Sequence, residues 1–563
     1  MFKNLFLLLL GFIISHIITV FLLAALYNKP FYIYSPFLLV SYCISIVKQH
    51  QIIPKLPLIS VSFYLIFPTI ILSLYQIFYE ENPDKKNKYG YAKFAGKDLI
   101  KKMGLNFDEG VVFGILRRNL WQSLFNPLGN KRVIKSNHPL STMIIAPTGT
   151  GKTAGFIIPT LKSLNNSVVV FDIKGELFQK TSQDRINLGH KILIFDVEKD
   201  GMKFNPFAKN QLPKDPRRLK SYIKNISNLI FDGSLSGEAG YKKGDNYFTN
   251  SAKELFNTIA LYLITQNGFT TIPKIKELLL GNNNARAIFV KIDEKLKDQL
   301  SEEKENQPHI EKELLLQVQQ GMAQILQISE AKDQFLGVIG SLTTILSAYD
   351  DMEIQEIINC ENSSVVADNL RKEKITIFIR VKDVDMERLK PLVALFFETL
   401  ITDLISSEAS DKDNQITFVL DEFGNLGKVS KLIKATTISR SYKLNQIFIL
   451  QDLAQIASIY SNEERSILEA NTAYKIILQQ NNFDTAKRIS EIIGFKTDTR
   501  ISKSSKESKT TISHDSISKS QEGIYLVTPQ DILNLNKNQC LIIVQGFAAS
   551  IILADIAWWF KIK

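Results

Sequence analysis

The sequence predicts an α/β fold: a mainly parallel sheet with helices on both faces, carrying an all-alpha insertion and preceded by N-terminal transmembrane helices. Short apolar runs alternate with helical patterns over much of the chain, which is typical of a parallel sheet. Between residues 210 and 350 the strand-like runs disappear and long helical patterns take over. Near the N-terminus lie uncharged apolar stretches that are long enough to cross a bilayer.

The length of 563 residues is too great for one compact core, so we expect several domains. The predicted bounds are 1–82 for the transmembrane region, 83–209 for the first part of the sheet domain, 210–350 for the all-alpha insertion and 351–563 for the second part. The three cysteines lie far apart and the six histidines show no ligand-like spacing, so no disulfide framework or zinc site is indicated. The net charge of +11 permits binding to nucleic acid or an anionic membrane, but over this length it is more typical of a solvated surface.

Residues 5–27 and 56–79 are the two clear candidates for membrane spans, and residues 31–47 form a weaker third. A cleaved signal peptide is the alternative for the first stretch, although its apolar part is longer than such peptides need. Lysines recur from Lys85 to Lys102, and positive charge beside a span marks the cytoplasmic side. We therefore expect the chain from about residue 80 onward to be cytoplasmic. Two spans would leave the N-terminus inside and three would leave it outside, and both remain open.

The strands of the sheet are predicted at residues 143–145, 167–171, 192–195, 375–381, 416–420, 446–450, 474–478 and 541–544. In the insertion, the clearest helical patterns cover residues 250–265 and 311–329. The basic residues between Lys214 and Lys224 could contact phosphates, but a solvated helix face is the more common meaning of such a cluster. Residues 500–521 are rich in Ser, Lys and Thr and poor in apolar side chains, so we expect a flexible loop there.

The strongest functional signal is a glycine-rich segment between a predicted strand and a predicted helix. It comprises Ala146, Pro147, Thr148, Gly149, Thr150, Gly151, Lys152 and Thr153. In such a setting, backbone N–H groups at the start of the helix surround phosphate oxygens, Lys152 reaches the β- and γ-phosphates, and the Thr153 hydroxyl binds Mg²⁺. The usual pattern begins with glycine, and Ala146 is small enough to keep the backbone close to a phosphate. We therefore predict that the sheet domain is a nucleotide-binding domain.

A second signal lies at the end of the predicted strand 416–420, which Asp421 and Glu422 follow directly. Ligands of open α/β sheets bind outside the carboxyl ends of the strands. Asp421 could hold Mg²⁺ there, and Glu422 could orient or polarise an attacking water. A solvated acidic turn is the alternative. Together with the glycine-rich segment, the pair predicts hydrolysis of the bound nucleotide.

Several segments, taken in order, resemble the coupling proteins of type IV secretion systems, the TraG/TraD-like membrane ATPases. GYAKFA at residues 90–95 is similar to the opening segment of that family, and HPLS at 138–141 precedes the phosphate loop as it does there. DIKGE at 172–176 matches the next signature of the family. FNPF at 204–207 and DEFGNLG at 421–427 complete the series. The resemblance covers nearly all of the predicted cytoplasmic part.

This resemblance implies a RecA- and FtsK-like motor ATPase that binds ATP and Mg²⁺ at the interfaces of a ring, commonly a homo-hexamer. Asp172, Lys174 and Glu176 would then belong to the nucleotide site, without an assigned chemical role. Arg440 matches the position from which related proteins reach the nucleotide of the neighbouring subunit, and a surface arginine is the alternative. Gln451 would sense the γ-phosphate or merely cap a turn.

The resemblance further implies a multi-pass ATPase of the bacterial inner membrane. It would recruit relaxase-bound single-stranded DNA, an effector protein or both, and couple this cargo to the inner-membrane proteins of a type IV secretion channel. Two alternatives stay open: a receptor that binds ATP without hydrolysing it, and a DNA translocase of the FtsK type. The intact acidic pair argues against the first. The second usually has a C-terminal DNA-reading module, for which we expect no room after the last predicted strand.

Overall fold

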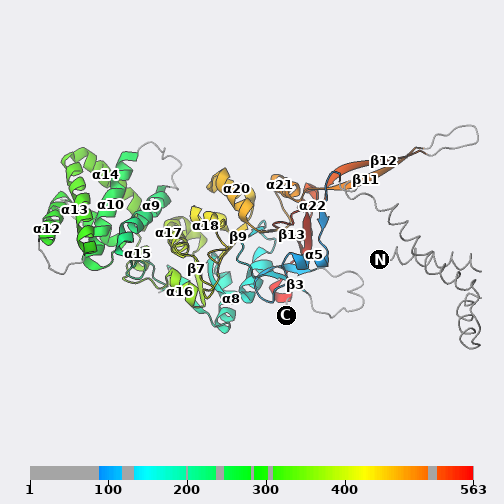
Figure 1. The fold of residues 1–563 in the computed structure, drawn as a ribbon, viewed down its shortest axis with the longest axis horizontal. Helices are drawn as coiled ribbons and strands as arrows, with labels where there is room; N and C mark the ends of the chain where they lie inside the picture. The colour runs from blue at the N-terminus through cyan, green and yellow to red at the C-terminus, as the bar shows by residue number, and fades with distance from the viewer. Residues whose placement is uncertain are drawn as a thin grey trace, which may run out of the picture. The chain divides into compact units, whose positions relative to one another are not determined.

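A computed structural model of the chain describes residues 88–116, 132–197, 201–235, 246–280, 285–301, 309–504 and 516–561. By its internal contacts the chain divides into two units: residues 92–494 with 525–563, and residues 1–91 with 495–524. The first of these units contains every strand of the large sheet (Figure 1).

A 12-stranded sheet forms the centre of the larger unit. Its strands are β1 (Lys93–Phe94), β2 (Val111–Leu116), β3 (Val133–Ser136), β4 (Thr142–Ile145), β5 (Ser167–Asp172), β6 (Lys191–Phe195), β7 (Ile375–Arg380), β8 (Ile416–Leu420), β9 (Leu444–Leu450), β10 (Tyr474–Ile477), β13 (Gln539–Val544) and β14 (Ser550–Asp555). The eight strands that the sequence predicts are all present. Strands β1, β2, β3 and β14 were not predicted.

The strand order is β3-β2-β14-β13-β10-β4-β9-β8-β5-β7-β6, with β1 paired to β14. From β10 to β6, every neighbouring pair is parallel, as the sequence predicts. On the other side of β10, the pairs β10–β13, β13–β14, β14–β2 and β2–β3 are antiparallel. The sheet is therefore mixed, and its parallel part carries the predicted functional residues.

Successive side chains of the central strands lie alternately in two separate hydrophobic cores. Val169 and Phe171 of β5 lie in one core, whereas Val168 and Val170 lie in the other. The pleat of a strand sends successive side chains to opposite faces, so each face of the sheet has a core of its own. Strands β4, β5, β8 and β9 are buried along their whole length, as expected for parallel strands covered on both faces.

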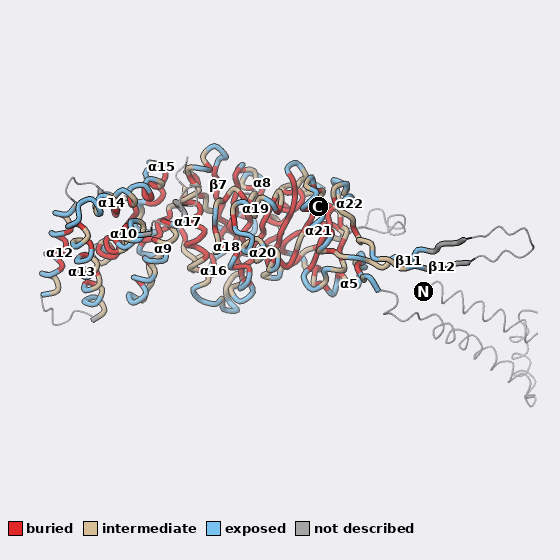
Figure 2. The backbone as a smooth tube through the Cα atoms, turned by 90° about the horizontal axis from the view of Figure 1, so that it is seen from above, coloured by how far each residue is buried: buried red, intermediate tan, exposed pale blue. Residues whose placement is uncertain are grey.

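Helices accompany the sheet on both sides. They are α5 (Lys97–Lys102), the π-helical turn η2 (Thr153–Ile157), α7 (Ile158–Ser163), α8 (Glu176–Asn187), α16 (Ala367–Lys372), η5 (Asp383–Asp385), α17 (Met386–Leu404), η6 (Phe423–Leu426), α18 (Ser430–Ala435), α19 (Leu453–Ile459), α20 (Asn462–Asn471), α21 (Phe483–Ile493), α22 (Pro529–Leu533) and η7 (Trp559–Lys561). Turn η2 and α7 are continuous, so together they form the helix that follows the glycine-rich segment. Figure 2 shows that much of the backbone drawn between α17 and α21 is buried.

Between β6 and β7 the described residues form helices and turns but no strand. The helices are η3 (Pro216–Arg218), α9 (Leu219–Leu235), α10 (Asn246–Asn267), α11 (Ile272–Leu280), α12 (Ala285–Ser301), α13 (His309–Glu330), α14 (Lys332–Leu346), η4 (Ser347–Tyr349) and α15 (Met352–Ile358), followed by α16. Helices α10 and α13 confirm the helical patterns predicted at residues 250–265 and 311–329. The bounds 210–350 of an inserted domain stay a prediction, since α15 and α16 continue the helical stretch beyond residue 350.

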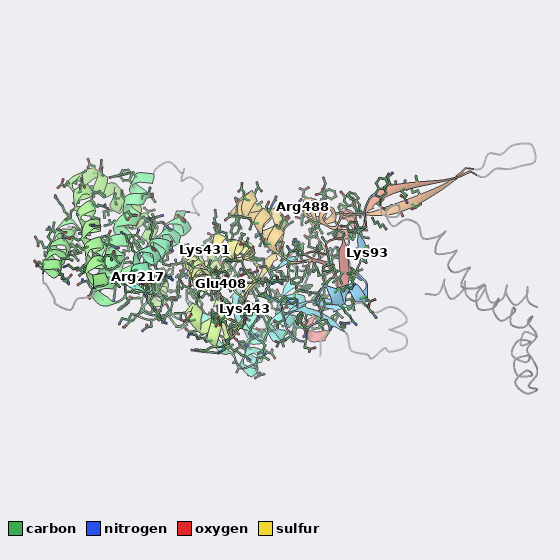
Figure 3. The ribbon with its side chains drawn as sticks, in the orientation of Figure 1. Lys93, Arg217, Glu408, Lys431, Lys443 and Arg488 are labelled. Atoms are coloured by element: carbon green, nitrogen blue, oxygen red, sulfur yellow. The ribbon has the colours of Figure 1, made fainter. Side chains whose placement is uncertain are left out.

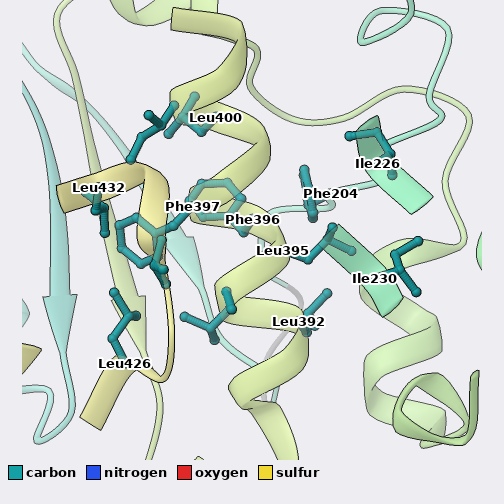
Figure 4. Packing of buried hydrophobic residues seen from close by; sticks show 14 of the residues in the cluster. Phe204, Ile226, Ile230, Leu392, Leu395, Phe396, Phe397, Leu400, Leu426 and Leu432 are labelled. Carbon is teal, nitrogen blue, oxygen red and sulfur yellow. The ribbon is translucent and has the colours of Figure 1, made fainter. Parts of the chain in front are cut away.

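Helix α17 ties these helices to the sheet. Phe396 contacts Phe204 edge-on, with ring centroids 5.2 Å apart. Figure 4 shows Phe397 on the side of Leu432 from α18, and Phe396 on the side of Ile230 from α9. All five side chains belong to one continuous core. The all-helical stretch and the strands of the sheet are therefore stabilised by the same apolar cluster.

In the other unit, β11 (Phe495–Ser504) and β12 (Ser516–Tyr525) pair as a two-stranded sheet. The prediction of a loop over residues 500–521 is therefore wrong for residues 500–504 and 516–521, while residues 505–515 lie outside the described part. Paired strands satisfy each other's backbone polar groups, so this segment forms strands despite its polar composition. The Thr497 N–H also donates to the carbonyl oxygen of Gly90 at 3.1 Å, which joins β11 to the rest of its unit.

The predicted transmembrane spans fall within residues 1–82, which lie outside the described residues. In the part of the chain that the structure describes, no helix is both long and apolar enough to span a bilayer. Two or three N-terminal spans therefore stay a prediction.

A buried arginine closes the end of α7. Arg185 of α8 is fully buried, and its guanidinium donates hydrogen bonds to the carbonyl oxygens of Leu161, Leu164 and Asn166. Its Nε also donates to Oγ1 of Thr376 at 3.0 Å. Carbonyls at the end of a helix lack intrahelical partners, so this side chain satisfies groups that would otherwise be buried and unpaired.

Replacing Arg185 with lysine should destabilise the protein by about 3 kcal/mol, because one ammonium group cannot reproduce the planar fork that serves these acceptors. The exposed Arg488 of α21, labelled in Figure 3, is the matched control because its ion pair with Glu469 lies at the surface. Its replacement by lysine should cost less than about 1 kcal/mol. Thermal unfolding of both variants measures the difference. If Arg185→Lys melts together with the wild type, the capping role is wrong.

Candidate active site

Four neighbouring strands bring the predicted functional residues to one edge of the sheet. Strands β4, β9, β8 and β5 are adjacent and parallel, so their carboxyl ends share that edge. Ligands of open α/β sheets bind at such an edge. The residues found there are the loop 146–153 after β4, Gln451 after β9, Asp421 and Glu422 after β8, and Asp172 at the end of β5.

The loop after β4 forms a tight turn that requires glycine at two positions. Gly149 and Gly151 have φ angles of +79° and +86°, in the left-handed region that favours glycine. The hydroxyl of Thr150 donates to the carbonyl oxygen of Pro147 at 2.7 Å and closes the turn. The helix that begins at Thr153 follows at once. The first N–H groups of a helix have no intrahelical partner, so they are suited to bind an anion.

Ala146 stands where the usual phosphate-loop pattern has glycine. It is fully buried, and its N–H donates to the carbonyl oxygen of Leu450 at 2.8 Å, which joins the start of the loop to the end of β9. Among the described residues other than glycine, only Glu422 and Lys443 have a positive φ. The backbone at Ala146 therefore does not require glycine, and this departure from the pattern leaves the loop conformation intact.

Lys152 is buried and lies against both acids of the second signal. Its Nζ is 3.2 Å from Oε1 of Glu422 and 3.8 Å from Oδ1 of Asp421. Only 7% of Lys152 is exposed. A cation that has lost its hydration must be paired, so the two carboxylates stabilise the ammonium in this position. The ion pair connects the loop after β4 with the turn after β8.

Asp421 is a carboxyl group whose surroundings disfavour its charge. Burial raises the pKa of Asp421 to about 6, the ammonium of Lys152 counteracts this, and the negative charges of Glu422 and Asp172 add to it. Its Oδ1 has no hydrogen-bond donor. A buried carboxylate oxygen without a donor fits a cation or a cation-bound water. No set of three His, Cys, Asp or Glu side chains in the described ranges could hold a metal alone, so Mg²⁺ would combine Asp421 and Thr153 with phosphate oxygens.

Glu422 is held by its backbone and by Asn425. Its φ of 56° and ψ of 53° are left-handed, a conformation that costs about 1 kcal/mol for a residue with a Cβ. The side-chain amide of Asn425 donates to Oε2 of Glu422 at 3.1 Å, while Oε1 faces Lys152. Asn425 was not predicted as a site residue. The sequence indicates Asn425 only by its position three residues after Glu422. At that spacing a short helix brings the two side chains to the same side.

Asp172 organises the turn between β5 and α8. Its buried carboxylate accepts a hydrogen bond at 2.9 Å from a backbone N–H in the first turn of α8, and burial raises its pKa. Lys174 is exposed, and its charge lowers the pKa of Asp421. Glu176 pairs with Lys180 of the same helix at 2.7 Å. The charges of Asp172 and Lys174 thus act on Asp421, whereas the ion pair of Glu176 runs along α8.

Arg440 and Gln451 lie at opposite edges of the sheet. Gln451 follows β9 directly, beside the start of the loop, because Leu450 accepts the hydrogen bond from Ala146. Arg440 precedes β9 and is exposed. Strand β9 has seven residues and is therefore about 20 Å long. That length separates Arg440 from the edge that carries Lys152, so Arg440 does not serve the site of its own chain.

Trp558 is a further residue that the sequence analysis missed. Its ring lies so close to Gly151 that a Cβ added to this glycine would overlap it. The contact arises because β14 returns the chain to the sheet and the residues after it pass over the loop. No sequence pattern links residue 558 to residue 151, so only the fold reveals this neighbour.

Residues 94–562 match the family described as "Type IV secretory system Conjugative DNA transfer". The chain belongs to this family. Among its relatives, protein VirD4 of Rhizobium radiobacter is 27% identical over 78% of the chain and 59% of its own length. The conjugal transfer protein TraG of Escherichia coli is 22% identical over 81% of the chain and 72% of its own length. The chain thus spans less than two thirds of the VirD4 relatives it matches, between 59% and 64%.

Solved structures of a bacterial conjugative coupling protein, TrwB, share the fold of this family member. The complex of TrwB with ADP and Mg²⁺ matches with a TM-score of 0.54 at 14% identity, over 84% of this chain and 94% of TrwB. The complex with a non-hydrolysable ATP analogue gives 0.55 at 15% identity, with the same coverage. At such identity the likeness shows the α/β fold, with its mixed parallel and antiparallel sheet.

In this member of the family, replacing Gly151 with alanine should weaken nucleotide binding at least about tenfold more than replacing Gly149. Both glycines are left-handed, so each alanine is strained by about 1 kcal/mol or more. A Cβ at Gly149 meets nothing within 4 Å, whereas a Cβ at Gly151 overlaps the ring of Trp558. Equilibrium binding of a fluorescent ATP analogue measures both variants. Equal losses would contradict the role of the Trp558 contact.

Proposed function

We propose that the chain is an ATPase that binds ATP with Mg²⁺ and hydrolyses it to drive a substrate into a type IV secretion channel. The observation that carries the proposal is the meeting of Lys152, Asp421 and Glu422 beside the glycine-rich loop. Membership of the conjugative DNA transfer family supports it. The TrwB complexes with ADP and Mg²⁺ or an ATP analogue, which share the fold, are consistent with it.

Nucleotide binding would begin with a change of partner at Lys152. In the structure Lys152 pairs with Glu422 and lies near Asp421. The β- and γ-phosphates together carry more negative charge than one carboxylate, so the ammonium should turn to them. Glu422 then loses its cation and stays fixed through Asn425. Binding of ATP thus frees Glu422 to act as the general base.

Hydrolysis would follow from the groups gathered at this edge. Glu422 accepts a proton from the water that attacks the γ-phosphorus, while the bond from the γ-phosphorus to the bridging oxygen breaks and ADP leaves with that oxygen. Lys152 and the N–H groups of the loop stabilise charge on the phosphate oxygens during the transfer. When bound by Thr153 and Asp421, Mg²⁺ supplies further neutralisation of these oxygens. Gln451, which follows β9 beside the loop, would contact the γ-phosphate.

We further propose that the protein works as a homo-hexameric ring with ATP at the subunit interfaces. Arg440 supports this arrangement, because it is exposed and lies at the edge of the sheet opposite the site of its own chain. A guanidinium supplied by a neighbouring subunit can stabilise the transferring phosphoryl group. The number of six subunits comes from the family resemblance alone.

The membrane and the cargo complete the proposal. The apolar stretches within residues 1–82 would anchor the ring in the bacterial inner membrane by two or three spans, with the sheet domain and the helical insertion in the cytoplasm. The cargo would be relaxase-bound single-stranded DNA, an effector protein or both, passed to inner-membrane proteins of the channel. The TraG relatives, named for conjugal transfer, favour the DNA.

Replacing Glu422 with glutamine should lower ATP hydrolysis at least about 100-fold while ATP stays bound, because the amide keeps the shape but cannot take a proton. Replacing Lys152 with alanine should abolish hydrolysis and substrate transfer and leave membrane insertion intact. Phosphate release and equilibrium ATP binding by the full chain measure these effects. The matched control is Glu361→Gln, which should keep the rate because Glu361 pairs with Lys209 at the surface. Unchanged turnover in Glu422→Gln would refute the hydrolytic role, and ATP binding without turnover in the wild type would favour the receptor alternative.

Replacing Arg440 with alanine should abolish hydrolysis without weakening ATP binding in the isolated subunit. A mixture of Arg440→Ala and Lys152→Ala subunits should regain part of the activity, because some interfaces then combine an intact loop with an intact arginine. Phosphate release by mixtures of defined ratio measures the recovery. If no ratio recovers activity while mixed rings form, Arg440 does not act between subunits.

A further inference from the structure

The residues after β14 form an aromatic segment, Trp558–Phe560, that packs against the glycine-rich loop and its helix. The ring of Trp558 lies on Gly151, and the side chain of Ile556 lies equally close to Gly155 in the first turn of the helix. The aromatic segment therefore contacts the loop at Gly151, and Ile556, two residues before it, contacts the helix at Gly155.

The three rings of the segment have different surroundings. Trp559 is anchored on the helices α7 and α8 by Lys162, whose Nζ lies 4.9 Å from the ring centroid, and by Lys180 at 5.7 Å. Trp558 and Phe560 are stacked on each other, with centroids 5.8 Å apart and planes inclined by 29°. Phe560 is 60% exposed. An exposed aromatic ring next to a phosphate-binding loop leaves apolar surface in water that a ligand could cover.

Asn538 holds the ring of Trp558 and the backbone of Ile556 two residues before it. Its side-chain oxygen accepts a hydrogen bond from the indole Nε1 at 3.2 Å, and its backbone carbonyl accepts one from the Ile556 N–H at 2.8 Å. The only polar atom of the indole is thereby used. Trp558 and Phe560 present carbon faces alone, which can stack on a flat ring but cannot read its hydrogen-bonding edge.

The path of a bound nucleotide leads toward this surface. The loop holds the β- and γ-phosphates, and the α-phosphate follows at the first turn of the helix, where Gly155 lies. Ribose and base must leave the loop beyond this turn. The aromatic segment contacts Gly151 and follows Ile556, which contacts Gly155, so in the proposed complex it would border that exit.

We propose that Trp558 and Phe560 form the surface on which the base of the bound nucleotide stacks. This inference rests on the proposed nucleotide binding and assigns its base subsite. Because stacking uses only the faces of the rings, the surface accepts any purine nucleoside triphosphate, and the site discriminates little between ATP and GTP through these residues.

The test compares nucleotides with a ligand that has no base. Affinities of the full chain for ATP, GTP and inorganic tripolyphosphate are measured by competition against a fluorescent nucleotide. Phe560→Ala should weaken ATP and GTP binding about five- to a hundredfold and leave tripolyphosphate binding unchanged. Phe560→Tyr should restore the affinity. The exposed Phe483 of α21 is the control, and Phe483→Ala should change none of the three affinities.

A second measurement reports on Trp558 itself. ATP should quench the tryptophan emission of the wild type, tripolyphosphate should not, and the quench should disappear in Trp558→Phe. An equal loss of ATP and tripolyphosphate affinity in Phe560→Ala would show that the segment only shapes the loop, and unchanged ATP affinity would show that it has no part in binding. Either result overturns the inference and leaves the proposed ATPase standing. A wild type that binds neither ligand would overturn both.

Discussion

The ion pair between Lys152 and Glu422 is the interaction on which the rest of the site depends. Its two residues lie 270 positions apart, and they meet because β4 and β8 flank β9 in one parallel sheet. Burial deprives the ammonium and the carboxylate of water, so each stabilises the other until a stronger anion arrives. In the proposed mechanism the triphosphate of ATP is that anion, and its binding also frees Glu422 to act as the general base.

The site is maintained against local strain by the elements around it. Glu422 has a left-handed backbone, and Asp421 is buried so far that its pKa rises to about 6. The strained backbone of Glu422 and the buried carboxyl of Asp421 both persist because β8 and β9 are buried along their whole length. These strands cannot shift to relieve the strain or to expose the carboxyl. Helix α17 packs on the same core and reaches α9, so the helical stretch and the strands that carry the site share one apolar cluster.

The parallel strands and the phosphate loop could be predicted from the sequence, because buried parallel strands read as unbroken apolar runs and the loop chemistry is local. Strand β2 escaped prediction since Gly114 interrupts it and its pairing with β3 shifts register there. The two-stranded sheet of β11 and β12 was mistaken for a loop because backbone pairing leaves little trace in amino-acid composition. Asn425 and Trp558 could not be assigned, since their roles arise from contacts that only the folded chain makes.

A structure of the full chain with Mg²⁺ and a non-hydrolysable ATP analogue tests the central claim most directly. The account predicts that the analogue occupies the loop 146–153, and that Nζ of Lys152 has left Glu422 for the β- and γ-phosphate oxygens. Glu422, still held by Asn425, should then face the γ-phosphorus through a water. An analogue bound elsewhere, or bound at the loop with the Lys152–Glu422 pair intact, would contradict the account.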